Sequence, residues 1–279
     1  MKKLLFVSIL CLLLLTACDW RSTPTETTAP ATVETTLPPA TEPITEATTE
    51  ATTESTTEST TEPVTEPAET APLHSPLYIP GLSVEDVILY FNEVCLDAEF
   101  VNGGDATRLQ RWESTIYYQL YGDYTEEDLA VLTNFTAWLN TIEGFPGMEE
   151  TQDPMLTNLR IHFCTQDEMI ALLGDNFSYM DAGVTFWYMN DEIYDAIICY
   201  RTDLNQYLRN SVILEEIYNG LGPVQDTELR PDSIIYSYYS EPQNLTEIDE
   251  LLLKLLYHPR MQCGMTAAEC ETVIRELYY

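Results

Sequence analysis

The sequence predicts an α+β fold with a mixed sheet for residues 76–279. Four Ser or Thr residues in this stretch are each followed, three positions later, by an acidic residue, which is the pattern of a helix start. Short segments rich in aromatic and β-branched residues lie between them and predict strands. The stretch also has the length and the apolar content of one domain with its own core.

Capping patterns and apolar periodicity place the predicted helices, and clusters of aromatic and β-branched residues place the strands. A further helix, residues 204–221, ends at Gly222 followed by Pro223, which is a normal stop signal. The other helices are predicted at 83–98, 125–142, 248–257 and 266–278, and the strands at 116–121, 159–164 and 196–200.

The chain begins with the pattern of an export signal. Two lysines precede an unbroken apolar run, residues 4–15, which is shorter than the roughly 20 residues that a transmembrane helix needs. Residues 15–18, Leu-Thr-Ala-Cys, resemble the lipobox of bacterial lipoproteins, in which the cysteine is acylated and the peptide is cut before it. The resemblance implies that residues 1–17 are removed and that lipid on Cys18 holds the mature chain on the extracytoplasmic face of a cell membrane. A chance cysteine after an ordinary signal peptide is the alternative.

Residues 18–75 predict a disordered stalk between this anchor and the domain. Thr, Glu, Pro and Ala dominate the segment, and residues 47–62 repeat a four-residue pattern that would stack like charges on one helical face. A segment this polar cannot bury enough surface to offset its chain entropy. We expect a reach of roughly 40 Å as a coil and about 170 Å when extended. The stalk either lifts the domain through a cell wall or surface layer, or is passive filler.

The chain is strongly acidic, with a formal net charge of −34 at pH 7. Only a minority of the carboxylates lie in the stalk, so the domain is acidic as well. Such a surface repels phosphate backbones, and we therefore expect no nucleic-acid partner. The expected partners are membrane lipid, through acylated Cys18, and a protein or another component of the cell envelope.

Five cysteines remain in the domain after the signal sequence and Cys18 are set aside. An odd number cannot all pair, although Cys263 and Cys270 lie close together in the sequence. A cysteine nucleophile would need a base, and neither His162 nor His258 lies in a recognisable thiol-protease context. We expect mostly buried free thiols at Cys95, Cys164, Cys199, Cys263 and Cys270.

The predicted helix 204–221 carries the most informative polar residues. Glu215 and Glu216 lie inside it, Asn219 shares a face with Glu215, and Gln225 follows the stop. Residues 215–225, Glu-Glu-Ile-Tyr-Asn-Gly-Leu-Gly-Pro-Val-Gln, resemble the metzincin zinc-protease motif HExxHxxGxxH with its histidines replaced. The resemblance implies a zincin-like fold with an active-site-type helix followed by carboxyl-terminal helices. Two further segments resemble parts of those enzymes. Residues 233–236, Ser-Ile-Ile-Tyr, resemble the turn beneath the zinc, and residues 245–257 resemble the final helix.

A closer resemblance covers the last third of the domain. The Glu-Glu pair, the amide at Asn219, Gly222 and the Pro259-Arg260 pair resemble the uncharacterised bacterial family called domain of unknown function 2927. His258 stands where that family has an aspartate. The family has no established activity, so the resemblance implies a fold and the function must be argued from the site.

The motif residues support two hypotheses about the site. Zinc prefers nitrogen and sulfur ligands, and this helix offers only oxygen, so zinc and ordinary zinc proteolysis are disfavoured. In the first hypothesis, Glu215, Asn219 and Gln225, with Glu216 beside them, bind a hard cation such as calcium or a polar ligand. Glu216 would be catalytic only if the domain is active, because it occupies the position of the metzincin general base. In the second hypothesis, the polar groups bond one another in an inactive cleft, where Arg209 is the ion-pair partner of the glutamates.

These observations lead to three expected functions. The first is a surface-displayed, non-catalytic binding or assembly module on a degenerate metallopeptidase-like scaffold. The alternative is a hydrolase of peptide or cell-wall material that uses a non-standard metal or a carboxylate pair. A purely structural envelope protein is the third, and it predicts that internal partners satisfy both glutamates.

Overall fold

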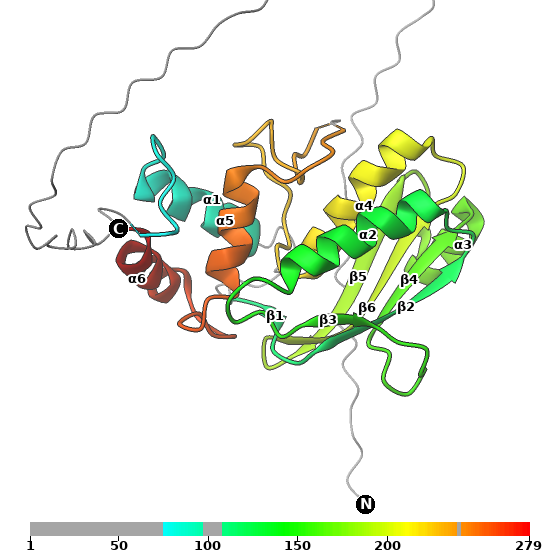
Figure 1. The fold of residues 1–279 in the computed structure, drawn as a ribbon, viewed down its shortest axis with the longest axis horizontal. Helices are drawn as coiled ribbons and strands as arrows, with labels where there is room; N and C mark the ends of the chain where they lie inside the picture. The colour runs from blue at the N-terminus through cyan, green and yellow to red at the C-terminus, as the bar shows by residue number, and fades with distance from the viewer. Residues whose placement is uncertain (1–74, 97–107, 239–240) are drawn as a thin grey trace, which may run out of the picture. The chain divides into compact units, whose positions relative to one another are not determined.

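The computed structural model describes residues 75–96, 108–238 and 241–279 (Figure 1). The expected signal sequence, Cys18 and the linker lie outside these residues. The described part combines a mostly parallel sheet with six α-helices, in agreement with the predicted mixture of a sheet and carboxyl-terminal helices.

The sheet contains six strands in the described part of the chain. Four of them, in the order β3-β2-β4-β6, are parallel, and β5 is antiparallel to β6. β1 pairs in parallel with the first residues of β6. Asn190 and Asp191 join β5 to β6 with φ angles of 55° and 65°, which are typical of a tight hairpin turn. The strands are β1 (Arg111–Trp112), β2 (Ile116–Gly122), β3 (Met148–Glu150), β4 (Leu159–Cys164), β5 (Ala182–Met189) and β6 (Glu192–Arg201).

The helices begin where the capping patterns predict. Thr125, Thr246 and Thr266 each form a capping box, and the Ser83 hydroxyl accepts a hydrogen bond from the backbone N–H of Asp86. Thr165 forms a fourth capping box, which opens a helix that the sequence reading missed. The helices are α1 (Val84–Leu96), α2 (Glu126–Leu139), α3 (Gln166–Leu173), α4 (Gln206–Gly220), α5 (Glu247–Leu256) and α6 (Ala267–Tyr278).

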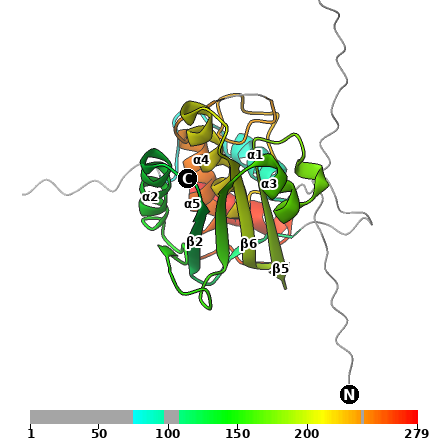
Figure 2. The ribbon, with the colours of Figure 1, turned by 90° about the vertical axis from the view of Figure 1, so that its right-hand side faces the viewer.

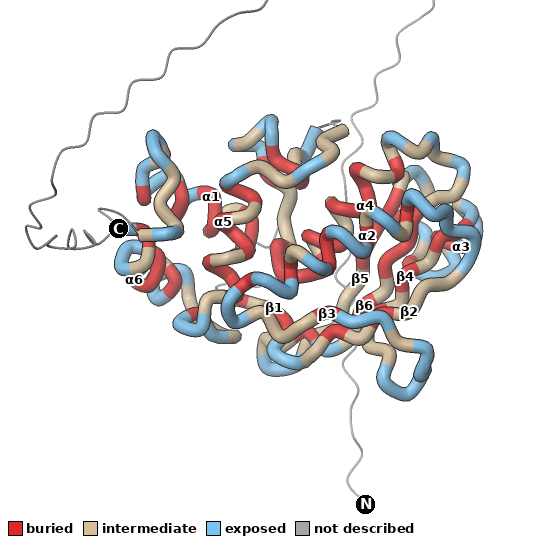
Figure 3. The backbone as a smooth tube through the Cα atoms, viewed as in Figure 1, coloured by how far each residue is buried: buried red, intermediate tan, exposed pale blue. Residues whose placement is uncertain are grey.

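The two faces of the sheet have different neighbours. On β4, Leu159, Ile161 and Phe163 belong to the main core, which also contains buried residues of α2 and α4. The alternate residue Cys164 belongs to a smaller cluster with Met169 and Leu173 of α3. Because successive side chains of a strand point to opposite faces, α3 lies on the face opposite α2 and α4. Figure 2 shows the strands together with these helices, and Figure 3 shows that much of α3 is exposed.

The first described residues of the domain form hydrogen bonds and ring contacts with its last helix. α1 packs against α5 and α6 at one end of the sheet (Figure 1). The Tyr278 hydroxyl lies 2.9 Å from the backbone oxygen of Leu82 and accepts a hydrogen bond from the backbone N–H of Ile79 at 3.2 Å. The Tyr78 and Tyr278 rings are 5.4 Å apart. The first described residues are therefore held by the carboxyl-terminal helix.

Candidate functional site

The predicted site residues lie on and just after α4, which packs against β5, β6 and α2. The side chain of the N-cap residue, Asn205, accepts a hydrogen bond from the backbone N–H of Leu208 at 3.0 Å. The helix ends at Gly220, close to the predicted stop. Gly222 has a φ of 129°, and a Cβ there would lie 2.5 Å from the backbone oxygen of Gln110, so glycine is required at this position.

Glu215 and Glu216 are half-buried neighbours on α4. Burial, together with the negative charges of Asp226 and Asp181, raises the pKa of Glu215 to about 8. Burial also raises the pKa of Glu216 well above its ordinary value, and the charges of Glu215 and Asp226 add to this effect. Neither carboxyl group has a hydrogen bond or an ion pair to any other residue that the structure describes. Both shifts favour the protonated form of these carboxyl groups over the ionised form.

Asn219 and Gln225 complete the predicted set. The Oδ1 atom of Asn219 is buried and has no hydrogen-bond partner among the described residues. Gln225 is half-buried, and its backbone N–H donates to the backbone oxygen of Val94 at 3.2 Å. No hydrogen bond joins either side chain to Glu215 or Glu216 within the described ranges. The motif therefore places polar groups in one region without linking them into a closed network.

Arg209 does not pair with the glutamates, so this part of the second hypothesis is wrong. Its Nε donates to Oδ1 of Asp128 at 2.8 Å, and its Nη2 donates to the side chain of Gln206 at 2.7 Å. Seven helical residues separate Arg209 from Glu216, about 10 Å along the axis. Asp128 in the first turn of α2 lies much closer and is fully buried, with 0% of its side chain exposed.

Among residues 75–96, 108–238 and 241–279, no three His, Cys, Asp or Glu side chains lie close enough together to hold a metal ion. Calcium takes six to eight oxygen ligands, and zinc takes about four ligands in a tetrahedral shell. The hypothesis of a calcium-binding pocket at Glu215, Asn219 and Gln225 therefore gains no support from the geometry.

The cysteines of the domain are free thiols, as the sequence predicts. Cys263 is half-buried and the others are buried. A hydrogen bond with Cys199 lowers the pKa of the Cys164 thiol, and this is the main cause of its shift. The free thiols of the domain are Cys95, Cys164, Cys199, Cys263 and Cys270.

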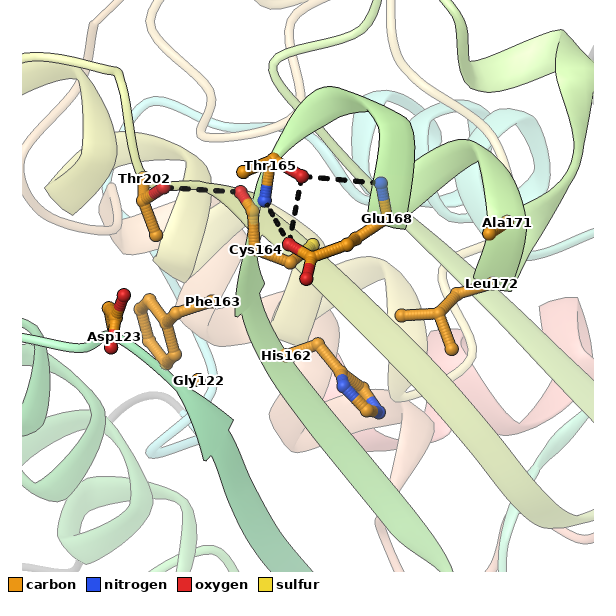
Figure 4. A pocket seen from close by; sticks show the side chains of 10 residues that line it. All are labelled: Gly122, Asp123, His162, Phe163, Cys164, Thr165, Glu168, Ala171, Leu172 and Thr202. Carbon is orange, nitrogen blue, oxygen red and sulfur yellow. Dashed lines mark hydrogen bonds between the residues drawn. The ribbon is translucent and has the colours of Figure 1, made fainter.

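A cavity of about 580 Å³ lies away from α4, at the carboxyl ends of β2 and β4 (Figure 4). Its lining includes His162 and Cys164 from β4, and Thr165 and Glu168 from the start of α3. Ligand sites in open parallel sheets often lie at the carboxyl ends of the strands. The sequence reading missed this cavity, because the parallel pairing of β2 with β4 could not be read from residue types.

The raised pKa of Glu215 predicts how stability varies with pH. The folded chain keeps a proton that the unfolded chain releases above the ordinary pKa of 4.5, so the free energy of unfolding should fall as pH rises from 4.5 to about 8. Glu215→Gln removes the part of this dependence that comes from Glu215. Urea unfolding at pH 5 and pH 8 measures the effect. From pH 5 to pH 8, the free energy of unfolding of the variant should rise relative to that of the wild type by on the order of 1–3 kcal/mol.

The exposed residue Glu149 provides the matched control for this experiment. Glu149→Gln should change stability by similar small amounts at both pH values. A constant difference between Glu215→Gln and the wild type at all pH values would show that Glu215 ionises normally in the folded chain.

The fold and site define a domain with a mostly parallel sheet, whose long helix carries two half-buried glutamates that have no ion-pair partner in the described part of the chain. Residues 85–276 match the family of proteins of unknown function DUF2927, and the chain belongs to this family. This confirms the family resemblance predicted from the motif. No curated protein matches the chain. Within the described residues, no helix combines the length and apolarity needed to cross a bilayer.

Proposed function

We propose that the chain is a lipoprotein whose domain is a non-catalytic binding module, displayed on the extracytoplasmic face of a membrane. The burial of Glu216 beside a second carboxyl group, Glu215, is the observation that carries the non-catalytic part. A general base must be ionised near the working pH, and burial beside the charges of Glu215 and Asp226 raises the pKa of Glu216 well above its ordinary value, which disfavours the ionised form. No three-ligand metal group among the described residues could activate a water molecule in its place.

The order of elements supports a metallopeptidase-like frame for this module. α4 carries the motif, the turn at residues 233–236 follows it, and α5 comes next. Ser233 and Ile234 in this turn are buried, and both donate hydrogen bonds to the side chain of Asp249 on α5. The metzincin motif has the same order of helix, turn and final helix. The replaced histidines make the proposed frame a degenerate one.

Substitution of Cys18 tests the proposed location. Cys18→Ala removes the thiol at the lipobox, so the chain should lose incorporation of an alkyne-tagged fatty acid, and residues 1–17 should stay uncut because the cut falls before the lipid-bearing cysteine. Cys11→Ala, which changes a cysteine inside the signal segment, should leave fatty-acid incorporation and cleavage unchanged. Incorporation of the fatty acid into Cys18→Ala would overturn the lipid anchor.

A hydrolase is the second candidate, and the raised pKa values of Glu215 and Glu216 favour it. Perturbed carboxyl groups concentrate at functional sites, and a protonated glutamate is a competent general acid. Digestion of peptides or cell-wall material by the purified chain, abolished by Glu216→Gln, would replace the non-catalytic proposal with this one. Digestion that Glu216→Gln leaves unchanged would exclude the motif as the active site.

A further inference from the structure

Two cysteines form a contact near the carboxyl ends of β4 and β6. Cys164 is the last residue of β4, and Cys199 lies on the neighbouring strand β6. Both belong to the smaller buried cluster, together with Met169, Leu173 and Phe177. A hydrogen bond joins the two side chains. The face of the sheet that α3 covers therefore carries a pair of thiols, which the proposed function does not use.

One thiol of this pair belongs to the wall of the cavity at the carboxyl ends of β2 and β4. Cys164 lines the cavity, and 7% of its surface is exposed. Cys199 is fully buried and is not part of the lining. Figure 4 shows the Cys164 side chain in the lining together with those of His162 and Glu168. A molecule in the cavity would therefore lie against Cys164, with Cys199 behind it.

The surroundings of the pair assign the ionised form to Cys164. A hydrogen bond with Cys199 lowers the pKa of Cys164 and outweighs burial and the charge of Glu168, which raise it. The same hydrogen bond and burial raise the pKa of Cys199. Cys164 also directly precedes Thr165, the N-cap of α3, where the helix dipole favours negative charge. Cys199 therefore keeps its proton and donates it to the Cys164 sulfur.

The remaining thiols of the domain are less suited to reaction. Burial raises the pKa of Cys95 well above its ordinary value, and it raises the pKa of Cys263 and of Cys270 to about 11. Thiol–disulfide exchange needs a thiolate that another molecule can reach. Cys263 is the most exposed of the five thiols, so exposure alone would make it the first to react. Cys164 instead combines a lowered pKa with a place in the cavity wall.

The cavity itself is acidic. Asp123 and Glu168 line it, and none of its lining residues, all of which the structure describes, is a Lys or an Arg. Hydrogen bonds from the backbone N–H and the hydroxyl of Thr165 lower the pKa of Glu168, so its carboxylate is ionised at pH 7. Burial lowers the pKa of His162, so its imidazole adds little positive charge at that pH. The cavity therefore attracts a cation and repels an anion.

We propose that Cys164 is a reactive thiol that exchanges with small, positively charged disulfides in this cavity. The Cys164 thiolate attacks one sulfur of the disulfide, the S–S bond of the disulfide breaks, and a new S–S bond joins Cys164 to that half. The other half leaves as a thiolate and takes up a proton from water. The Cys164 sulfur is oxidised and the released sulfur is reduced, so the step needs no other oxidant. A cavity of about 580 Å³ has room for such a molecule.

Cys199 is a positioning residue in this reaction rather than a second redox partner. Cys164 lies opposite Arg201, and Cys199 lies opposite His162, so the two cysteines are diagonal neighbours. Two residues of a strand span about 6.6 Å and paired strands lie about 4.8 Å apart, which puts the two Cα atoms about 8 Å apart. A disulfide joins Cα atoms about 4.4–6.8 Å apart. We therefore expect the mixed disulfide on Cys164 to persist.

This inference goes beyond the proposed binding module and does not depend on it. The thiol pair lies on the face of the sheet opposite α4, and its reaction can be measured with purified protein. Disulfides persist in oxidising compartments, so the proposed extracytoplasmic location would supply the co-reactant.

Mass-spectrometric mapping of the modified cysteines tests the inference. The full chain is purified in detergent, reduced, freed of reductant and treated with cystamine at pH 7, and samples are quenched with acid over time. We expect the mass of one cysteamine to appear on Cys164 about tenfold or more faster than on Cys263. First modification of Cys263 would overturn the reactive site. Modification of Cys164 only together with the buried Cys95 and Cys270 would also overturn it, because that pattern indicates reaction of the unfolded chain.

Substitutions of Cys199 separate its positioning role from packing. Cys199→Ala removes the hydrogen-bond donor and should slow modification of Cys164 at pH 7 about threefold or more, with the pH profile moved to higher pH. Cys199→Ser keeps a donor and should restore most of the rate. Cys263→Ser should leave the rate at Cys164 unchanged. An unchanged rate and pH profile in Cys199→Ala, or a disulfide between Cys164 and Cys199 in the product, would overturn the positioning role.

Three small disulfides test the charge of the ligand: cystamine is cationic, 2-hydroxyethyl disulfide is uncharged and dithiodiglycolate is anionic. Each rate at Cys164 is divided by the rate with the uncharged thiol N-acetylcysteine amide. At an ionic strength of about 0.1 M, this ratio should be about threefold to tenfold higher for cystamine than for dithiodiglycolate. Equal ratios for the three disulfides would overturn the cationic ligand class.

A matched pair of glutamate variants locates the source of this preference. Glu168→Gln removes a carboxylate from the cavity and keeps the capping box of α3, so it should reduce the preference for cystamine about twofold or more. Glu247→Gln removes an exposed carboxylate from α5, which lies on the far side of the domain from α3 (Figure 1), and should leave the preference unchanged. Equal preferences in the two variants would overturn the role of the cavity charge.

Discussion

Replacement of Asp249 by alanine is expected to lower the free energy of unfolding by about 3–5 kcal/mol. The Asp249 side chain is fully buried. Its Oδ1 accepts hydrogen bonds from the Tyr90 hydroxyl at 3.0 Å and the Ser233 hydroxyl at 2.7 Å. Its Oδ2 accepts from the backbone N–H groups of Thr246 at 2.9 Å and Ile234 at 3.2 Å. The substitution leaves these buried donors without an acceptor and removes the capping box of α5.

Urea unfolding at pH 7 measures this effect, with Glu250→Ala as the control. Glu250 is the next residue on α5 and forms a partly exposed ion pair with Lys254, so its loss should cost less than about 1 kcal/mol. Tyr90→Phe removes one of the donors and should cost less than Asp249→Ala. A loss below 1 kcal/mol for Asp249→Ala would show that the network contributes little to stability.

Arg209→Met is expected to destabilise the domain by about 3–5 kcal/mol, because it leaves the Asp128 carboxylate buried without its charged partner. Asp128 has no exposed side-chain surface. Burial raises the pKa of Asp128, but hydrogen bonds from Arg209, Thr125 and Gln206 outweigh burial and hold the pKa below its ordinary value. The pair therefore stabilises the folded chain above the ordinary pKa of 3.8, and this stability is lost as pH falls below it.

Denaturant unfolding of two further variants separates the ion pair from general packing effects. Arg230→Met breaks a partly exposed pair with Asp232 and should change stability by less than about 1 kcal/mol. The double variant Asp128→Leu with Arg209→Met removes both charges and should recover part of the loss. Equal stability of Arg209→Met and the wild type would show that Asp128 is satisfied without the arginine.

Local signals predicted the helices well, because a capping box and its apolar face lie within a few residues of sequence. The boxes at Thr125, Thr246 and Thr266 are each formed as expected. The box at Thr165 has the same chemistry, but it opens a helix of only 8 residues. The apolar pattern of so short a segment did not predict a helix. β3 is shorter still, at 3 residues, and exists through its pairing with β2. Such pairing depends on distant residues.

The candidate site was predicted in part. Glu215, Glu216 and Asn219 lie on one helix, and helical spacing alone placed them together. The partner of Arg209 lies 81 residues away in sequence, on a helix whose docking against α4 no local pattern specifies. The parallel pairing of β2 with β4 was hidden for the same reason. Alternation at Tyr117, Gln119 and Tyr121 marks one face of a strand, but the fold decides which face a helix covers.

The hydrogen bonds at Tyr278 have a mechanical consequence. If the segment before residue 75 tethers the domain, any pull on that tether enters the fold through the residues around Ile79 and Leu82. Tyr278 binds both of these residues, so the load passes directly to α6 at the opposite end of the chain. A tethered domain under tension would thus load the contacts between its first described residues and its last helix before any other part of the fold.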